Sequence, residues 1–224
     1  MRDQLPDFPW DALAPYGDKA RSHPKGIIDL SQGTPVDPTP EFIQAVFRDS
    51  SNSPSYPVTA GTPELRAAIK KWATDRLGAT GEFDVLPLIG SKELVAWLPT
   101  FLESTKVLIP EIAYPTYHVG ALLAGAQSVP VGIDAKAWPA ADLAWLNSPS
   151  NPTGRVHSVD EIKECINWSR INKSVLISDE CYLEFDQTAH SYSVLSQTGG
   201  DNTNILAVHS LSKRSSLAGY RAAF

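Results

Sequence analysis

The feature that most constrains the fold of this chain is an alternation of short, continuous apolar runs with helix-like segments. Strands that are apolar on both faces and separated by helices are typical of a parallel sheet covered on both sides. The sequence therefore predicts an α/β fold, a mostly parallel sheet covered by helices on both faces. The six apolar runs lie at 85–89, 106–110, 127–131, 143–147, 174–178 and 205–209.

Two of the helical segments carry clear boundary signals. Thr62 suits the N-cap of a helix, Pro63 suits its first position and Gly78 suits its C-terminal cap, so a helix is expected between them. Ser158 and Glu161 have the spacing of a capping box, in which each residue satisfies a free backbone N–H at a helix start. By contrast, the first 61 residues are rich in Pro, Ser and Asp and predict an arm with one short helix.

Charge and composition argue against several classes of partner. The formal net charge of −6 over 224 residues would repel nucleic acid and anionic membranes at long range. No apolar run approaches the roughly 20 residues that span a bilayer, and residues 1–15 lack the apolar region of a signal peptide. Cys165 and Cys181 form no CxxC pair, and the five histidines show no metal-ligand spacing. We expect a soluble, cytoplasmic protein with reduced cysteines and no metal.

Polar and aromatic side chains follow most of the apolar runs. In parallel sheets, ligands bind beyond the carboxyl ends of the strands, which meet at one edge. Each segment alone has an ordinary explanation, such as an N-cap or a turn, but the fold would gather them together. They are GSKE (90–93), EIAYPTY (111–117), NSPSNPTG (147–154), DECY (179–182) and SLSKR (210–214).

This combination of groups matches the needs of one cofactor, pyridoxal 5′-phosphate. A lysine forms a Schiff base with its aldehyde, and an acid pairs with its ring nitrogen. A phenol and an amide hydrogen-bond its ring hydroxyl, and an aromatic side chain stacks on the ring. A helix N-terminus with hydroxyls and an arginine holds its phosphate.

The same motifs resemble those of the fold-type I pyridoxal-phosphate enzymes, specifically the class I/II aminotransferases, over nearly the whole chain. In SLSKRSSLAGYR, the resemblance implies that Lys213 carries the cofactor and that Ser210 and Arg221 bind its phosphate. In SDECY, it implies that Asp179 pairs with the pyridine nitrogen and that Tyr182 reaches the ring hydroxyl. Lys213, Asp179 and Tyr182 are thus the expected catalytic residues.

The resemblance also assigns the remaining cofactor contacts. Asn151 of NPTG would reach the ring hydroxyl and line the substrate site, and Tyr114 of AYPTY would stack on the ring. The backbone at Ser91 and Lys92 of GSKE would cradle the phosphate. Tyr56 would reach the phosphate of the neighbouring subunit, which implies a homodimer.

The implied reaction transfers an amino group between glutamate and a 2-oxo acid. The amine of Lys213 would move the substrate Cα proton while Asp179 keeps the ring electron-poor, and Gly33 of LSQGTP would lie near the substrate carboxylate. Segments 5–16, 85–102 and 107–117 resemble actinobacterial N-succinyldiaminopimelate aminotransferases. These enzymes act on N-succinyl-LL-2,6-diaminopimelate, on the route to diaminopimelate and lysine.

Aminotransferases of this kind continue beyond the lysine motif into a small domain with an arginine for the substrate carboxylate. We therefore expect residues 1–61 to be an arm and small-domain segment, and residues 62–224 to be a large domain that is incomplete at its C-terminus. In the family fold the segment from Arg221 lies between the first and last apolar runs. An end at Phe224 would leave those runs short of hydrogen-bond partners.

Three alternatives stay open from the sequence. A lyase acting on the same cofactor, such as a C–S lyase, would share every cofactor contact. Ser210 and Lys213 also form the S-x-x-K pattern of penicillin-recognising serine acylases, although neither S-D-N nor K-T-G occurs in the chain. The third is a non-catalytic fragment that keeps the aminotransferase fold.

Overall fold

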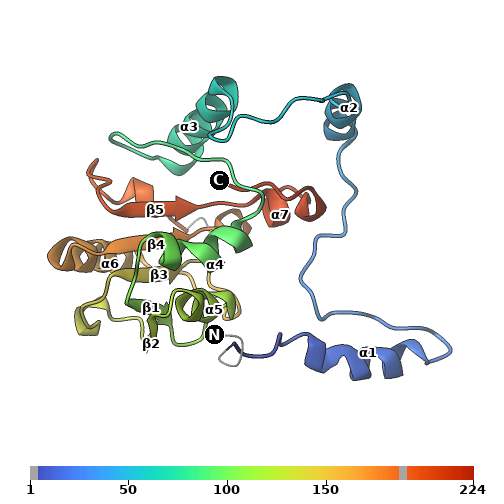
Figure 1. Ribbon diagram of the computed structural model, residues 1–224, viewed down its shortest axis with the longest axis horizontal. Helices are drawn as coiled ribbons and strands as arrows, with labels where there is room; N and C mark the ends of the chain where they lie inside the picture. The colour runs from blue at the N-terminus through green and yellow to red at the C-terminus, as the bar shows by residue number, and fades with distance from the viewer. Residues whose placement is uncertain (1–4, 187–190) are drawn as a thin grey trace.

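A computed structural model describes residues 5–186 and 191–224. Five strands form one sheet in the order β2-β1-β3-β4-β5, and every neighbouring pair is parallel (Figure 1). The predicted parallel α/β fold is thus confirmed. The strands are β1 (Lys106–Pro110), β2 (Gln127–Val131), β3 (Leu143–Asn147), β4 (Val175–Asp179) and β5 (Ile205–Val208).

Helices precede, separate and follow these strands. The α-helices are α1 (Ala14–Arg21), α2 (Glu41–Asp49), α3 (Pro63–Leu77), α4 (Ser91–Phe101), α5 (Thr116–Leu123), α6 (Val159–Asn172) and α7 (Leu211–Arg214). Short 3-10 helices are η2 (Asp11–Leu13), η3 (Ala135–Ala137), η4 (Leu183–Phe185), η5 (Val194–Ser196) and η6 (Ala218–Tyr220).

The helices cover both faces of the sheet because alternate strand residues point to opposite sides. In β3, Leu143 and Trp145 join a buried cluster with α4 and α5. Ala144 and Leu146 of the same strand join a second cluster with α3 and α6. All five residues of β3 are buried, as expected for the middle strand of a sheet with three layers.

The boundaries of α3 and α6 follow the predicted local signals. The Thr62 side chain accepts a hydrogen bond from the Leu65 N–H, and Gly78 ends α3 in a left-handed conformation. Ser158 and Glu161 form both bonds of the capping box at the start of α6. Each signal acts within one helical turn, so packing elsewhere does not change it.

The predicted strand at 85–89 is wrong. Among the described residues, this run forms only an isolated antiparallel bridge between Leu88 and Ala223, and Ala223 also bridges to Ser210. Apolar composition does not by itself make a strand, because a strand needs a partner along its length. The bridges do place Ala223 between Leu88 and Ser210, where the resemblance predicted the segment from Arg221.

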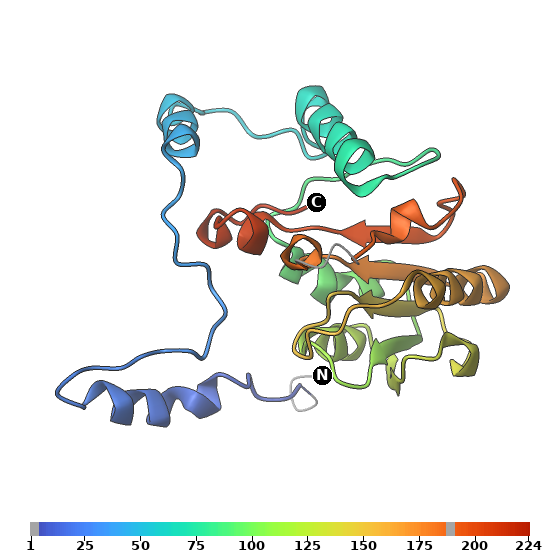
Figure 2. The ribbon, with the colours of Figure 1, turned by 180° about the vertical axis from the view of Figure 1, so that it is seen from behind.

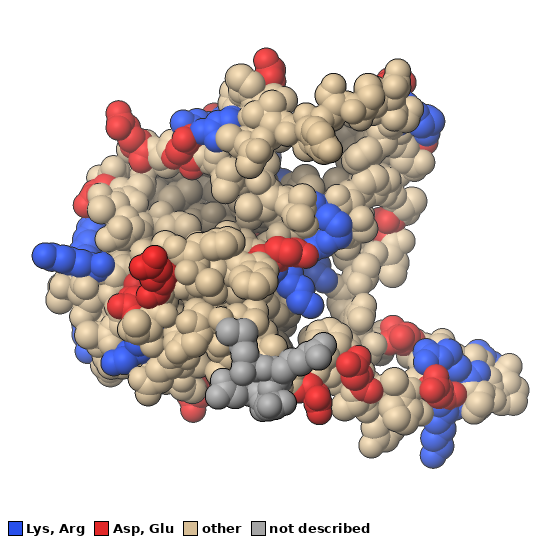
Figure 3. All heavy atoms as spheres, viewed as in Figure 1, with Lys and Arg blue, Asp and Glu red and all other residues tan. Residues whose placement is uncertain are grey.

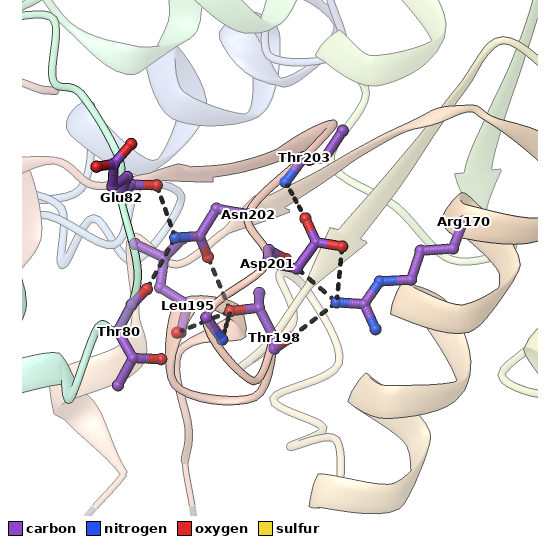
Figure 4. Close-up of polar contacts among 9 residues, drawn as sticks. Thr80, Glu82, Arg170, Leu195, Thr198, Asp201, Asn202 and Thr203 are labelled. Carbon is purple, nitrogen blue, oxygen red and sulfur yellow. Dashed lines mark hydrogen bonds and ion pairs between the residues drawn. The ribbon is translucent and has the colours of Figure 1, made fainter.

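A side-chain network fixes the turn that leads into β5 (Figure 4). Asn202 donates hydrogen bonds to the carbonyls of Thr80 and Glu82, which follow α3, at 2.8 and 3.0 Å. Arg170 of α6 donates to the Thr198 carbonyl at 2.7 Å. The segment after α3 and the helix α6 are therefore tied to the turn before the strand that precedes Lys213.

The segment that carries α1 and α2 stands apart from the sheet in both ribbon views (Figures 1 and 2). On α2, Phe42 and Val46 are exposed, as is Val36 before it. Acidic and basic side chains are interspersed on the face in Figure 3, with a hollow between this segment and the body. None of the helices within residues 5–186 and 191–224 has the length and apolar character needed to span a membrane.

Candidate active site

Asp179 is the last residue of β4 and is 8% exposed, at the carboxyl edge of the sheet. Its Oδ2 accepts a 2.6 Å hydrogen bond from the hydroxyl of Tyr117, and its Oδ1 accepts one from the Cys181 N–H at 3.2 Å. A buried carboxylate needs such partners, because its desolvation is costly. Asp179 is therefore held rigidly at a strand end.

Asn147, at the end of the neighbouring strand β3, connects Asp179 to the loop that contains Asn151. Its Nδ2 donates to the Asp179 carbonyl at 2.9 Å, and its Oδ1 accepts from the Asn151 N–H at 2.7 Å. Asn147 is buried, and its bond to Asp179 lies away from water while its bond to Asn151 is partly buried. One side chain thus fixes the relative positions of two predicted site residues.

A cavity of about 550 Å³ lies beside this loop and is lined by both Asn151 and Tyr182. Phe185 and Val156 contribute apolar surface to its wall. Burial raises the pKa of Tyr182 to about 12, so its hydroxyl stays protonated and can donate a hydrogen bond. The structure brings together the phenol and the amide that were predicted to meet a ring hydroxyl.

The N-terminus of α4 supplies backbone donors at the same edge. Gly90 is its N-cap and no side chain of the described residues caps the helix, so the N–H groups of its first turn are available to an anion. Ser91 is in contact with the Asp179 segment, since its Oγ lies 3.6 Å from Cys181 Sγ. Lys92 points elsewhere, with its ammonium 5.0 Å from the Phe8 ring centroid.

Arg221 reaches this helix start from the other end of the chain. A Cβ atom on Gly90 would overlap with Nη2 of Arg221, so a larger residue there would push the guanidinium aside. Arg221 Nη1 donates to the Ala218 carbonyl at 2.9 Å and lies 3.4 Å from Ser212 Oγ. Ser210 caps α7, where its Oγ accepts from the Ser212 N–H. Backbone donors, hydroxyls and a guanidinium thus converge as an anion would require.

Lys213 lies in α7, which follows β5, so it stands beyond the carboxyl end of the strand next to that of Asp179. Its ammonium donates a hydrogen bond to the carbonyl of Gly33. The structure therefore brings Gly33 and Lys213 together although 180 positions separate them.

Two of the predicted aromatic residues differ in their placement. Tyr114 is half-buried and packs edge-on against Tyr117, with ring centroids 5.8 Å apart. Tyr56 is 99% exposed, so its side chain packs against none of the other predicted residues. Within one chain, Tyr56 is thus not part of the cluster.

Sequence reasoning missed the roles of Tyr117, Asn147 and Ser212. Tyr117 lies three residues after Tyr114, the spacing that puts two side chains on one side of a helical turn. Asn147 was the last residue of a predicted strand, and a polar residue at that position was the available signal. For Ser212 the sequence offered no signal other than its position within the lysine motif.

Comparisons with known proteins agree with this geometry. Residues 25–224 match the family described as aminotransferase class I and II. The chain is 50% identical to the probable aminotransferase Rv1178 of Mycobacterium tuberculosis, over 98% of this chain and 54% of that protein. It is 46% identical to the 4-dedimethylamino-4-oxo-anhydrotetracycline transaminase OxyQ of Streptomyces rimosus, over 98% of this chain and 63% of that protein.

A solved structure has the same fold. The probable N-succinyldiaminopimelate aminotransferase of Thermus thermophilus superposes with a TM-score of 0.84 and 28% identity, over 96% of this chain and 63% of that one. The fold is that of the pyridoxal-phosphate-dependent aminotransferases, and the chain belongs to the class I and II aminotransferase family. It spans 54% and 63% of the two curated relatives.

Members of this family use pyridoxal 5′-phosphate, and the residues present fit that group. The uncapped start of α4, the space left by Gly90 and the guanidinium of Arg221 suit its phosphate. The buried carboxylate of Asp179 suits a protonated ring nitrogen.

Proposed function

We propose that this protein is an aminotransferase that uses pyridoxal 5′-phosphate to exchange an amino group between an amino acid and a 2-oxo acid. The observation that carries the proposal is the placement of Asp179, Lys213 and the uncapped N-terminus of α4 at one edge of the sheet. These groups come from three separate parts of the chain.

The residues around the start of α4 would hold the phosphate. The N–H groups of Ser91 and Lys92 would donate to its oxygens, together with the hydroxyl of Ser210 and the guanidinium of Arg221. Tyr114 would stack on the ring, and Asn151 and Tyr182 would donate to its hydroxyl from the wall of the cavity.

Asp179 and Lys213 would perform the proton chemistry. When bound, the cofactor supplies an electron-withdrawing ring that stabilises negative charge at the substrate Cα. The carboxylate of Asp179 would hold the proton on the ring nitrogen. The Nζ atom of Lys213, in its neutral form, would accept the Cα proton, and Gly33 and Asn151 would orient the substrate carboxylate.

For the substrates, we propose glutamate as amino donor and the 2-oxo acid of N-succinyl-LL-2,6-diaminopimelate as acceptor, on the route to diaminopimelate and lysine. The likeness to the Thermus protein, whose name states this substrate class, supports the proposal. The name of the Streptomyces relative states an oxo-tetracycline substrate instead. A substrate panel must therefore contain both classes.

We further propose a homodimer in which Tyr56 reaches the phosphate in the partner subunit. The exposure of Tyr56 at 99% supports this role, since its side chain is free to reach beyond its own chain. Ile89, Trp97, Phe101 and Ile112 are also exposed, around α4 and the end of β1, and would be covered by a second copy.

We also propose that residues 1–61 act as an arm and small-domain segment, and that residues 62–224 bind the cofactor. We propose a cytoplasmic location. Limited proteolysis with mass spectrometry would test the domain division: cleavage within 50–61 should come first, and cleavage first within 62–180 would contradict it.

The decisive experiment is an absorption spectrum of the purified protein with added pyridoxal 5′-phosphate, before and after borohydride. We expect a visible band, and reduction should attach the cofactor to Lys213 in the peptide map. Lys213→Ala should lose both signals, and Lys163→Ala should keep them. Attachment to another lysine, or no attachment in a folded sample, would contradict the proposal.

The alternatives give different products in the same assay. An aminotransferase turns over glutamate repeatedly only with a 2-oxo acid present, and it releases no ammonium. A C–S lyase acting on the same cofactor would release ammonium and a thiol from a sulfur-containing amino acid. A serine acylase would instead show a covalent penicillin adduct on Ser210, whose hydroxyl here caps α7.

A further inference from the structure

One ion pair and one close contact between a glutamate and a histidine connect the segment after β4 to the segment after β5. Glu180 Oε2 lies 3.1 Å from His209 Nε2. Glu184 accepts a hydrogen bond from Nε of Arg214. The first segment directly follows Asp179 and the second contains Lys213, so these contacts lie between the two central residues of the proposed site.

Trp72 of α3 packs against the basic member of each pair. The His209 ring meets it edge-on with centroids 5.0 Å apart, and the Arg214 guanidinium lies 4.8 Å from its ring centroid. A guanidinium over an indole is a favourable cation–π contact. His209, four residues before Lys213, and Arg214, one residue after it, therefore both contact Trp72.

The four side chains in these contacts are largely shielded from water. The side chains of Glu180 and His209 are 0% and 5% exposed, and Glu180 Oε1 also accepts from the Val194 N–H at 2.7 Å. The side chains of Glu184 and Arg214 are 28% and 24% exposed. Arg214 and Glu184 are opposite charges that are partly buried and therefore costly to separate, so this pair restrains the distance between its two segments.

The helix that carries Lys213 has little rigidity of its own. α7 comprises only the four residues Leu211–Arg214, too few for a helix to be stable without outside contacts. Arg214 is its last residue and reaches across to Glu184 and Trp72. The orientation of the turn that carries Lys213 thus depends on where the Arg214 side chain is anchored.

We propose that Arg214, anchored by Glu184 and Trp72, is a positioning residue that sets the orientation of Lys213 relative to Asp179. The consequence of this positioning for catalysis rests on the proposed function, in which Lys213 reacts with the cofactor. The anchoring of Lys213 can be measured without cofactor.

The test compares Arg214→Ala with Glu184→Gln in the otherwise intact chain. The rate at which Lys213 captures pyridoxal 5′-phosphate is monitored by absorption and by borohydride trapping. This rate should be about tenfold lower in both variants, because misplaced reacting groups react slowly. Charge alone would act in opposite directions. Arg214→Ala removes a positive charge near Lys213, whereas Glu184→Gln removes a negative one.

A second readout uses the chain without cofactor. Lys213 donates a hydrogen bond to the Gly33 carbonyl, so a loosened amine should be acetylated faster by acetic anhydride. Peptide mapping should show a several-fold increase at Lys213 in both variants, with Lys163 as the internal reference. Arg214→Lys keeps the charge and should restore part of both effects.

Glu164→Gln is the matched control. Glu164 pairs with Lys136 at 2.6 Å, and its side chain is 28% exposed, as is that of Glu184. This variant should behave as the unmodified chain in both readouts.

Unchanged acetylation in both anchor variants would overturn the proposal, as would opposite changes in the two variants or equal changes in Glu164→Gln. Failure of the unmodified chain to capture the cofactor would contradict the aminotransferase proposal. The acetylation rates would then still decide whether Arg214 anchors Lys213.

Discussion

The hydroxyl of Tyr117 donates a 2.6 Å hydrogen bond to the carboxylate of Asp179 at the buried base of the candidate site. The Tyr117 ring also stacks on Trp145, with centroids 4.8 Å apart. Burial, together with the adjacent Asp179 carboxylate, raises the pKa of Tyr117 well above its usual value. The phenol therefore keeps its proton and gives Asp179 a permanent donor.

Tyr117→Phe should destabilise the fold by about 1–3 kcal/mol, because it removes a donor from a buried carboxylate. It should also weaken uptake of pyridoxal 5′-phosphate, since Asp179 loses part of its support. Urea unfolding and a cofactor titration measure the two effects. Tyr16 is 72% exposed, and Tyr16→Phe should change neither. Equal stabilities of the two variants would contradict this prediction.

Asn147→Ala should separate the Asn151 loop from Asp179 and cost about 1–3 kcal/mol, because a buried carbonyl and a partly buried N–H lose their partner. Thermal and urea unfolding measure the cost. Asn172→Ala is a suitable control, since the Asn172 side chain donates at 2.8 Å to the Trp168 carbonyl at the end of α6, away from the site. The Asn147 variant should lose cofactor affinity and the Asn172 variant should keep it; the reverse would count against the prediction.

Gly90→Ala should reduce affinity for pyridoxal 5′-phosphate by about tenfold or more, because the new methyl group would displace Arg221. The matched control is Gly125→Ala, where φ is +71° and no described atom lies within 4 Å of the added Cβ. Both changes strain the backbone, but only the first blocks the anion site. Equilibrium titration with the cofactor and with phosphate-free pyridoxal should show that the loss is confined to the phosphorylated form. Equal losses for both ligands would contradict the proposed phosphate site.

His157 should make the fold less stable below neutral pH. Burial, with a smaller contribution from Arg155, lowers its pKa to about 4. The unfolded chain, with an ordinary histidine pKa near 6.5, binds more protons between pH 4 and 6.5, so stability is complete above this range and falls as the pH drops through it. The loss should reach up to about 3 kcal/mol.

His157→Gln should flatten this pH dependence, as measured by urea unfolding at several values from about pH 4 to 8. His118 is exposed, and His118→Gln should leave the slope as it is. A slope that His157→Gln does not reduce would show that other groups cause the acid sensitivity.

Much of the fold was predictable because its signals are local. The cap residues Thr62, Gly78 and Ser158 act within a turn of their own helices, and the structure confirms them. The run at 85–89 failed as a strand because pairing depends on a partner elsewhere in the chain. In the part of the chain that the structure describes, that partner is Ala223, through one bridge.

The sequence by itself determined which chemical groups this protein brings to the carboxyl edge of its sheet, since Asp179, Asn151 and Lys213 follow recognisable runs. Only the tertiary structure decided what supports them. Tyr117 is 62 positions from Asp179, and Arg214 is 30 positions from Glu184. These contacts arise from the order of the strands and the packing of helices across them, and no pattern within a single element specifies that order.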